Sequence, residues 1–281
     1  MKLQLFKTLW GHQGTLASAI SEALEAGFHG LEGPAPANTV AIRELKTLLA
    51  DSGLNYIAEI TTAGSYVPDR HASIQQHIDS FAEQLDQSLP FNPLFITCLG
   101  GCDAWTDDMN ITFFNAAMEM AQSADITVSF ETHRGRAFCN PWVTDRIVSQ
   151  LPEIKLTCDF SHWCVVCERL LDSELEVLQK LSSHAHHIHA RVGYDQGPQV
   201  PHPAAPEYEY ALRAPQSWWE MIWQQQLHKK AQVTTMTPEF GPDGYLHELP
   251  FSGEPVAFLW DLNCWMASEE RRHFEAFMAR Q

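Results

Sequence analysis

The sequence is poor in basic residues. It has 18 lysines and arginines against 35 aspartates and glutamates, which gives a formal net charge of −17. A protein that binds the nucleic-acid backbone needs a positive face, so this balance disfavours nucleic acid as a partner. A small anionic substrate would need only a local basic patch, for which Arg134, Arg136 and Arg191 are the candidates.

Long apolar runs are also missing. No uninterrupted apolar stretch approaches the roughly 20 residues that a membrane-spanning helix needs. The first residues, MKLQLFKTLWGHQG, lack the apolar core and the small-residue cleavage site of a signal peptide. Seven cysteines in a long chain are more typical of reduced thiols than of a secreted disulfide framework, and Cys164 and Cys167 form a lone C-x-x-C that is expected to hold buried thiols. These features predict a cytoplasmic protein without membrane contact.

No linker or change of composition divides the 281 residues. Short apolar strands alternate along the chain with helix-length segments, and this alternation is typical of a parallel sheet. Eight such units at this length predict one closed (β/α)8 TIM barrel over residues 1–281. The alternative is a doubly wound open sheet, but Gly11-His12-Gln13-Gly14 is a poor match to the glycine-rich phosphate turn of that class. The proline-rich run Gly193–Pro215 is expected to be a long ordered loop.

Four of the predicted strands end in a side chain that can bind a metal ion. The four residues are Glu131, Asp159, His189 and Glu239, at the ends of Ile126–Phe130, Lys155–Asp159, His187–Arg191 and Val233–Glu239. Because the carboxyl ends of all barrel strands meet at one rim, these side chains are expected to converge. Strand alternation places His187 on the same face as His189, and His189 is preferred because it lies nearer the carboxyl end. Three carboxylates and one imidazole predict one site for Mn²⁺, Co²⁺, Mg²⁺ or Zn²⁺.

Further polar residues near the strand ends are candidates for binding a substrate. They are Glu59, His133, Arg134, His162 and Arg191. His162 could contact substrate, support a metal ligand or be a ligand itself. His133 and Arg134 could instead brace the mouth of the barrel by pairing with Glu32 or Glu59. Trp10 and Trp105 lie in loops after strands, where an aromatic ring could stack on a sugar.

The motifs at these positions resemble those of the xylose isomerase-like TIM-barrel superfamily of sugar isomerases and epimerases, which includes the D-tagatose 3-epimerases. The motifs are FETHRGR at Glu131, CDFSHW at Asp159 and His162, HIHAR at His189 and Arg191, and TPEFG at Glu239. The resemblance covers nearly the whole chain. It implies one divalent metal ion bound by the two Glu, the Asp and the His.

The resemblance also implies a mechanism. Glu131 would remove the proton next to a carbonyl and Glu239 would return one through an enediolate, while the histidine of D-x-x-H, His162, would contact the substrate. The ketose epimerases carry a further Glu shortly after the metal Glu, where this chain has Arg134, Arg136 and Ala137. This departure concerns the substrate more than the metal, and arginines at the mouth would suit an acidic or oxygen-rich sugar derivative.

Three other functions stay open at this point. A dehydratase of a keto-sugar or inosose would use the same metal set. A nuclease like endonuclease IV needs further histidines at the ends of the second to fourth strands, where the sequence has none. A barrel that only binds a sugar would catalyse no reaction, so replacing Glu131 or Glu239 by Gln would abolish no activity. For the isomerase, the epimerase and the dehydratase the partner is a small sugar-derived molecule, and the sequence leaves the oligomeric state open.

Overall fold

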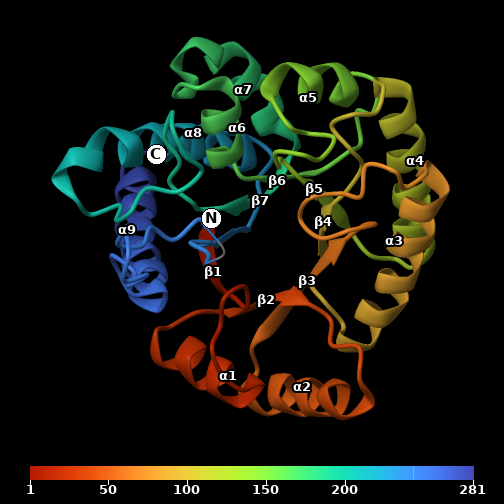
Figure 1. Cartoon of the computed structure of the whole chain (residues 1–281), viewed down its shortest axis with the longest axis horizontal. Helices are drawn as coiled ribbons and strands as arrows, with labels where there is room; N and C mark the ends of the chain where they lie inside the picture. The colour runs from red at the N-terminus through yellow and green to blue at the C-terminus, as the bar shows by residue number, and fades with distance from the viewer. Residues whose placement is uncertain (243) are drawn as a thin grey trace.

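Eight short parallel strands close into a barrel in a computed structural model that describes residues 1–242 and 244–281 (Figure 1). Each strand pairs with its neighbour in sequence, and the last pairs with the first, Lys2 opposite Val233. The strands are β1 (Lys2–Thr8), β2 (Gly30–Pro34), β3 (Asn55–Thr61), β4 (Ile96–Leu99), β5 (Val128–Glu131), β6 (Leu156–Cys158), β7 (Ala185–His189) and β8 (Val233–Thr237). The predicted TIM barrel is therefore confirmed.

Helices form a ring around the strands, as Figure 1 shows. They are α1 (Leu16–Glu25), α2 (Thr39–Ser52), α3 (Ile74–Ser88), α4 (Asp107–Ser123), α5 (Pro141–Val148), α6 (Ser161–Cys167), α7 (Leu175–Leu181), α8 (Glu209–His228) and α9 (Leu259–Met278). Each long helix turns an apolar stripe towards the barrel. In α4, for example, Phe113, Phe114 and Ala117 are fully buried because spacings of three and four residues fall on one side of a helix.

Local signals explain where several helices begin and end. The Asn38 side chain accepts a hydrogen bond from the backbone N–H of Ala41 and so caps α2. Gly53 ends α2 with a φ of 68°, a left-handed conformation that glycine adopts without a steric penalty. Ser73 and Gln76 form a reciprocal capping box at the start of α3.

The floor of the barrel is filled by a small apolar cluster. Phe6, Ile57 and Phe95 form it, and the ring of His187 lies 5.3 Å from that of Phe95. Side chains from β1, β3 and β7 can meet only inside the barrel, because these strands are not neighbours. The neighbouring strand accommodates Phe6 through Gly30, where a Cβ would lie 2.6 Å from the Phe6 ring. The barrel is therefore closed below the rim where the candidate site lies.

The run Gly193–Pro215 is not one long loop as predicted. Helix α8 already begins at Glu209 and contains Pro215. Proline lacks the backbone N–H that a helix uses, which disfavours it inside α8. Burial of Ala211, Leu212 and Pro215 on one face of α8 offsets this loss. Only the first part of the run connects β7 to α8.

The cysteines and the helices bear on two predictions made from composition, namely reduced thiols and the lack of a membrane span. All seven cysteines are free, and burial raises the pKa of both Cys164 and Cys167. The C-x-x-C thiols are therefore buried, as predicted. Within the described residues, no helix is both long enough and apolar enough to span a bilayer.

Candidate active site at the carboxyl end of the barrel

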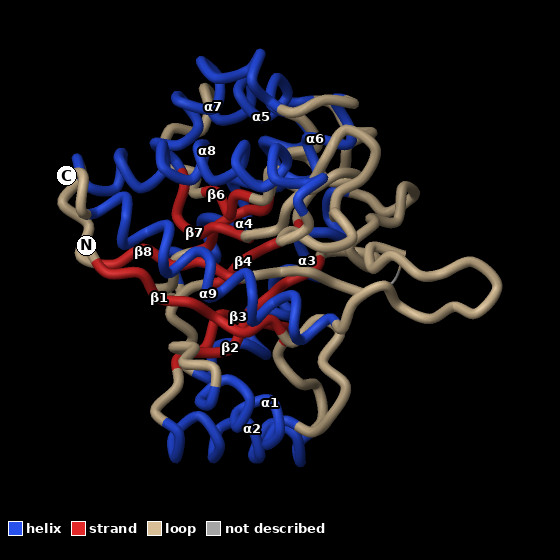
Figure 2. The backbone as a smooth tube through the Cα atoms, turned by 90° about the vertical axis from the view of Figure 1, so that its left-hand side faces the viewer, coloured by secondary structure: helices blue, strands red, loops and turns tan. Residues whose placement is uncertain are grey.

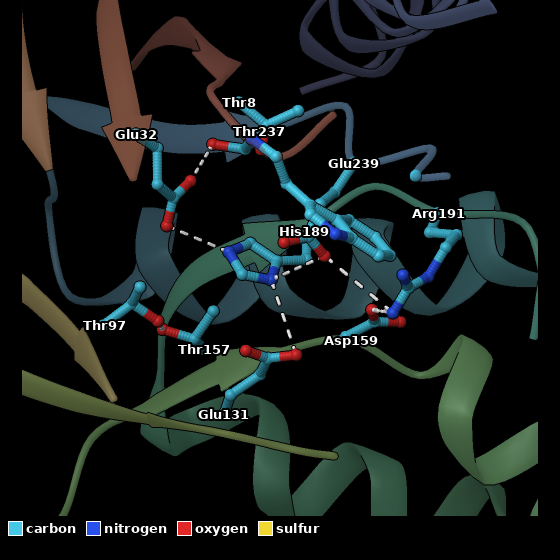
Figure 3. A network of polar contacts seen from close by, with 12 residues as sticks. Thr8, Glu32, Thr97, Glu131, Thr157, Asp159, His189, Arg191, Thr237 and Glu239 are labelled. Carbon is cyan, nitrogen blue, oxygen red and sulfur yellow. Dashed lines mark hydrogen bonds and ion pairs between the residues drawn. The ribbon is translucent and has the colours of Figure 1, made fainter. Parts of the chain in front are cut away.

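The four predicted metal ligands come together. Glu131 ends β5, His189 ends β7, and Asp159 and Glu239 lie just beyond β6 and β8. One ligand atom from each lies within 4.8 Å of all the others, and all four residues are buried. Figure 3 shows the side chains pointing to a common centre from four neighbouring strands. In Figure 2 the longest loops extend on the side opposite the N-terminus, the side to which the strands point.

The imidazole of His189 is oriented by a carboxylate behind it. Nε2 lies 3.0 Å from Oε1 of Glu32, and because an ionised carboxylate only accepts hydrogen bonds, Nε2 must carry a hydrogen. Nδ1 points the other way, 3.1 Å from Oε2 of Glu239 and 3.7 Å from Oε1 of Glu131. Among the described residues, Nδ1 has no hydrogen-bond partner. A buried nitrogen that faces carboxylate oxygens without such a bond fits a metal ligand.

The electrostatics of the group call for a cation. Burial lowers the pKa of His189, but Glu239, Glu32 and Glu131 outweigh burial and raise this pKa well above its ordinary value. Burial raises the pKa of Glu131 to about 7, with Glu239 and Asp159 adding to the rise and His189 opposing it. Buried carboxylates this close together need positive charge between them. A divalent ion satisfies that need, and the donor set of three oxygens and one nitrogen suits it.

Glu32 is the residue that the sequence analysis placed wrongly. It was considered as a brace for His133 or Arg134, yet its carboxylate contacts Nε2 of both His187 (3.2 Å) and His189, and Thr237 donates a hydrogen bond to it. Burial raises the pKa of Glu32, but the two histidines outweigh burial and lower it well below its ordinary range. The available signal was the carboxylate of Glu32 on the second strand, although in the structure it lies within β2 and not at its end.

Arg191 is engaged by the candidate ligand Asp159. Its Nη2 forms an ion pair with Oδ2 of Asp159, and its Nε donates to Oγ of Ser161 at 3.0 Å. The backbone N–H of Ser161 in turn donates to Oδ1 of Asp159 at 2.9 Å. His162 is fully buried beside this pair, with Nε2 3.6 Å from Oδ2 of Asp159. These contacts hold the Asp159 carboxylate in one orientation.

A cavity opens directly onto the four-residue group. It is small and partly open to solvent, and two members of the group, Glu131 and Glu239, lie in its wall. Its lining residues are Trp10, Glu59, Tyr66, Leu99, Glu131, His133, Arg191, Glu239 and Tyr245. Three of the predicted substrate contacts, Glu59, His133 and Arg191, therefore line it.

The other predicted substrate contacts lie outside this lining. His162 is buried behind it, and the guanidinium of Arg134 lies 5.0 Å from the ring centre of Tyr245. Trp10 lines the cavity, whereas Trp105 packs on His77 with ring centres 4.6 Å apart.

Solved structures of sugar enzymes share this architecture, although no family model and no curated protein matches the chain by sequence. L-ribulose 3-epimerase is 11% identical, and the match covers 100% of this chain and 97% of that one with a TM-score of 0.67. A D-allulose 3-epimerase from Methylomonas sp. in complex with D-allulose is 10% identical over 96% of each chain, with a TM-score of 0.64. The chain has the fold of these sugar epimerases. The predicted resemblance to the xylose isomerase-like barrels is thereby confirmed for the fold.

The same fold is found in an enzyme of another reaction class. The probable 3-DHS dehydratase AsbF from Bacillus anthracis is 14% identical, and the match covers 95% of this chain and 98% of that one with a TM-score of 0.60. The fold therefore accompanies both epimerisation and dehydration, and the choice between them must come from the residues of the site.

Arg136 does not contribute to a basic patch at the mouth, and that hypothesis is wrong for this residue. Its side chain is fully buried and donates to the backbone carbonyls of Thr62 (2.7 Å), Tyr66 (3.1 Å) and Ser65. Arginine suits this position because its planar guanidinium offers five donors in a fixed geometry. Arg136 thus holds the β3–α3 loop, which places Tyr66 in the cavity wall.

Replacing Arg136 by Met is expected to lower the free energy of unfolding by about 3 kcal/mol or more, because several buried carbonyl groups lose their donor at once. Urea unfolding followed by tryptophan fluorescence measures this change. Arg43→Met is the matched control, since Arg43 is exposed and makes one hydrogen bond to the carbonyl of Thr39. Equal stability of the two variants would show that the β3–α3 loop is held by other contacts.

Proposed function

We propose that the protein is a divalent-metal-dependent sugar isomerase or epimerase that moves a proton at the carbon next to a carbonyl. The observation that supports this most directly is the placement of Glu131 and Glu239. Both carboxylates line the same cavity, and both belong to the group that surrounds Nδ1 of His189. Two carboxylates that face one small cavity from different strands are suited to remove and return a proton.

The metal ion would be held by Glu131, Asp159, His189 and Glu239. When bound, such an ion supplies positive charge that stabilises the negative charge developing on substrate oxygen atoms. Glu32 keeps the His189 ring turned so that Nδ1 faces the ion, and Arg191 keeps Asp159 turned towards it.

The proton steps fall to the two glutamates. In the proposed reaction Glu131 accepts the proton from the carbon next to the carbonyl, which leaves an enediolate, and Glu239 donates a proton to the opposite face of that carbon. A donation to the neighbouring carbon instead would interchange aldose and ketose. The same two side chains therefore serve an epimerase or an isomerase.

Aromatic side chains would keep water from the reacting carbon and hold the sugar. The ring centre of Trp10 lies 6.2 Å from that of Tyr66 and 5.1 Å from that of Tyr245, and all three residues line the cavity. Aromatic faces of this kind pack against the C–H faces of sugars. Removal of water strengthens the electrostatic interactions on which proton transfer depends.

A dehydratase is the second candidate, favoured by the shared fold with a probable dehydratase. In that reaction Glu131 accepts the same first proton, but the electron pair then expels a hydroxyl group from the next carbon, which leaves as water with a proton donated by Glu239. Analysis of the product separates the two candidates, because epimerisation conserves the mass of the sugar and dehydration lowers it by one water.

The proposed function is tested by solvent-deuterium exchange. The protein is loaded separately with Mn²⁺, Co²⁺, Mg²⁺ and Zn²⁺ and incubated in D₂O with a panel of ketoses, inososes and uronates. We expect deuterium at a carbon next to the carbonyl of at least one compound, detected by NMR and mass spectrometry, and none with metal-free protein. A metal-loaded protein that exchanges nothing across the panel would favour a barrel that only binds sugar.

A further inference from the structure

Glu239 lies where the sheet no longer supports the chain. Strand β8 ends at Thr237, and its last pairing with β7 joins that residue to His189. Glu131, by contrast, lies within β5 and is paired with Thr157 of β6. The ladder of the barrel therefore fixes one of the two proposed proton-transfer groups but not the other.

Two side-chain amides take the place of the ladder after β8. The backbone N–H of Phe240 donates to Oδ1 of Asn263 at 2.9 Å, and Nδ2 of Asn263 donates to the carbonyl of Phe240 at 3.0 Å. The next residue is held in the same way. The N–H of Gly241 donates to Oε1 of Gln199 at 2.8 Å, and Nε2 of Gln199 donates to the carbonyl of Gly241 at 3.3 Å. Each buried amide thus satisfies both backbone polar groups of one residue.

The two amides come from different parts of the chain. Asn263 lies on α9, and Gln199 lies in the connection between β7 and α8. They tie the segment Phe240-Gly241 to two further elements of the fold at successive residues. The segment that follows Glu239 is therefore restrained although it belongs to no strand.

The connection that carries Gln199 is itself firmly packed. Val192 and Val200 are fully buried, and the N–H of Val200 donates to the carbonyl of Val192 at 2.9 Å. A Cβ at Gly193 would lie 2.7 Å from Cα of Ser161, which hydrogen-bonds to a proposed metal ligand. The first part of the proline-rich run thus packs directly against the site, which gives Gln199 a rigid base.

The restrained segment determines the position of two parts of the cavity wall. Glu239 lines the cavity, and so does Trp10, whose ring lies so close to Gly241 that a Cβ there would overlap it. Oε2 of Glu239 lies 3.1 Å from Nδ1 of His189. A shift of the backbone at Gly241 would move the carboxylate relative to that nitrogen, and a misplacement of about 1 Å is enough to slow a proton transfer.

We propose that Gln199 and Asn263 are positioning residues, which together hold the carboxylate of Glu239 beside Nδ1 of His189. This inference rests on the proposed function, in which Glu239 binds the ion and donates the proton. A primary amide suits the task because it offers a donor and an acceptor without bringing a charge into a buried place.

The experiment removes each amide and keeps the approximate size of the side chain. Gln199→Met and Asn263→Leu are compared with the wild-type protein in calorimetric titrations of metal-free protein with Mn²⁺, where we expect the affinity to fall by about tenfold. Turnover is then measured at saturating Mn²⁺ with whichever compound of the panel exchanges deuterium. We expect kcat to fall by about 10- to 100-fold and KM to change by less than about twofold, because a displaced carboxylate impairs the chemical step and not binding.

Gln84→Met is the matched control. Gln84 on α3 forms the same kind of reciprocal pair with Thr61 at the end of β3, since it accepts from the N–H at 3.1 Å and donates to the carbonyl at 2.9 Å. This pair supports neither proposed proton-transfer group. Gln84→Met should therefore lower the melting temperature and leave kcat and the Mn²⁺ affinity unchanged.

Gln199→Glu is a second variant that keeps the length of the side chain. A neutral carboxyl group offers one donor and one acceptor, as the amide does. Its kcat, relative to that of the wild-type protein at the same pH, should therefore recover as the pH is lowered, whereas that of Gln199→Met should not.

Thermal unfolding shows that each variant is folded. Wild-type kcat and Mn²⁺ affinity in folded Gln199→Met and Asn263→Leu, or an equal loss in Gln84→Met, would overturn the inference and leave the proposed function standing. A wild-type protein that binds Mn²⁺ but exchanges deuterium with no compound of the panel would overturn the proposed function, and the Mn²⁺ affinities of the variants would then decide the inference.

Discussion

Replacing Glu131 by Gln is expected to reduce deuterium exchange by about 10³-fold or more, and Glu239→Gln should have an effect of the same order. An amide cannot accept the proton that each carboxylate is proposed to handle. Glu131 and Glu239 are also the two members of the four-residue group that line the cavity. The measurement is single-turnover exchange in D₂O, so that binding and product release do not mask the chemical step.

Both glutamates are also proposed metal ligands, so metal content must be measured on the same samples. Activity lost in a variant that still carries one ion per chain identifies a proton-transfer role. Activity lost together with the ion identifies a ligand role only. The reference variant is Glu44→Gln, because Glu44 is an exposed carboxylate on α2. Exchange close to the wild-type rate in both glutamate variants would contradict the proposed mechanism.

Removing the divalent ion is expected to produce the second large effect. At a free concentration about 1,000 times its dissociation constant, an ion that binds only the folded protein stabilises it by about 4 kcal/mol, which corresponds to a rise in melting temperature on the order of 10 °C. We therefore expect the protein to melt at a lower temperature after treatment with a chelator and to recover when the ion is restored. Differential scanning calorimetry measures both transitions.

Histidine variants assign this stabilisation to the proposed site. His189→Ala should abolish the metal-dependent rise, whereas His71→Ala should keep it because His71 is exposed in the loop before α3. Glu32→Gln should weaken metal affinity by about 10- to 100-fold without abolishing binding, since Glu32 orients His189 and is not itself a proposed ligand. A metal-dependent rise that persists in His189→Ala would place the ion elsewhere.

The predicted convergence of four side chains depends on local signals. Glu131, Asp159, His189 and Glu239 each lie at the end of a predicted strand, and His189 is preferred over His187 because it lies nearer the carboxyl end. The closed parallel barrel then brings the four strand ends to one rim, as the structure shows. Predicting these four residues required no knowledge of contacts between residues that are distant in the sequence.

The misplaced residues depend on contacts between distant parts of the chain. Glu32 meets His189 across 157 positions in the sequence, and Arg136 reaches the carbonyl of Thr62 across 74. Tyr66 and Tyr245 lie in loops, whose course has no periodic pattern from which to predict it. The start of α8 at Glu209 was missed because local proline signals favoured a loop and burial of Ala211 and Leu212 favoured a helix.

The amino-acid sequence by itself determined the class of fold, the four strand-end residues and the acidic balance of the chain, because periodicity and charge are properties of neighbouring residues. Only the tertiary structure decided which way His189 faces, which arginines are engaged with the protein, and that Glu59 lines the same cavity as Glu131 and Glu239. Those features arise where side chains from separate strands meet in a space that excludes water. There each hydrogen bond and charge depends on partners that the order of the residues does not reveal.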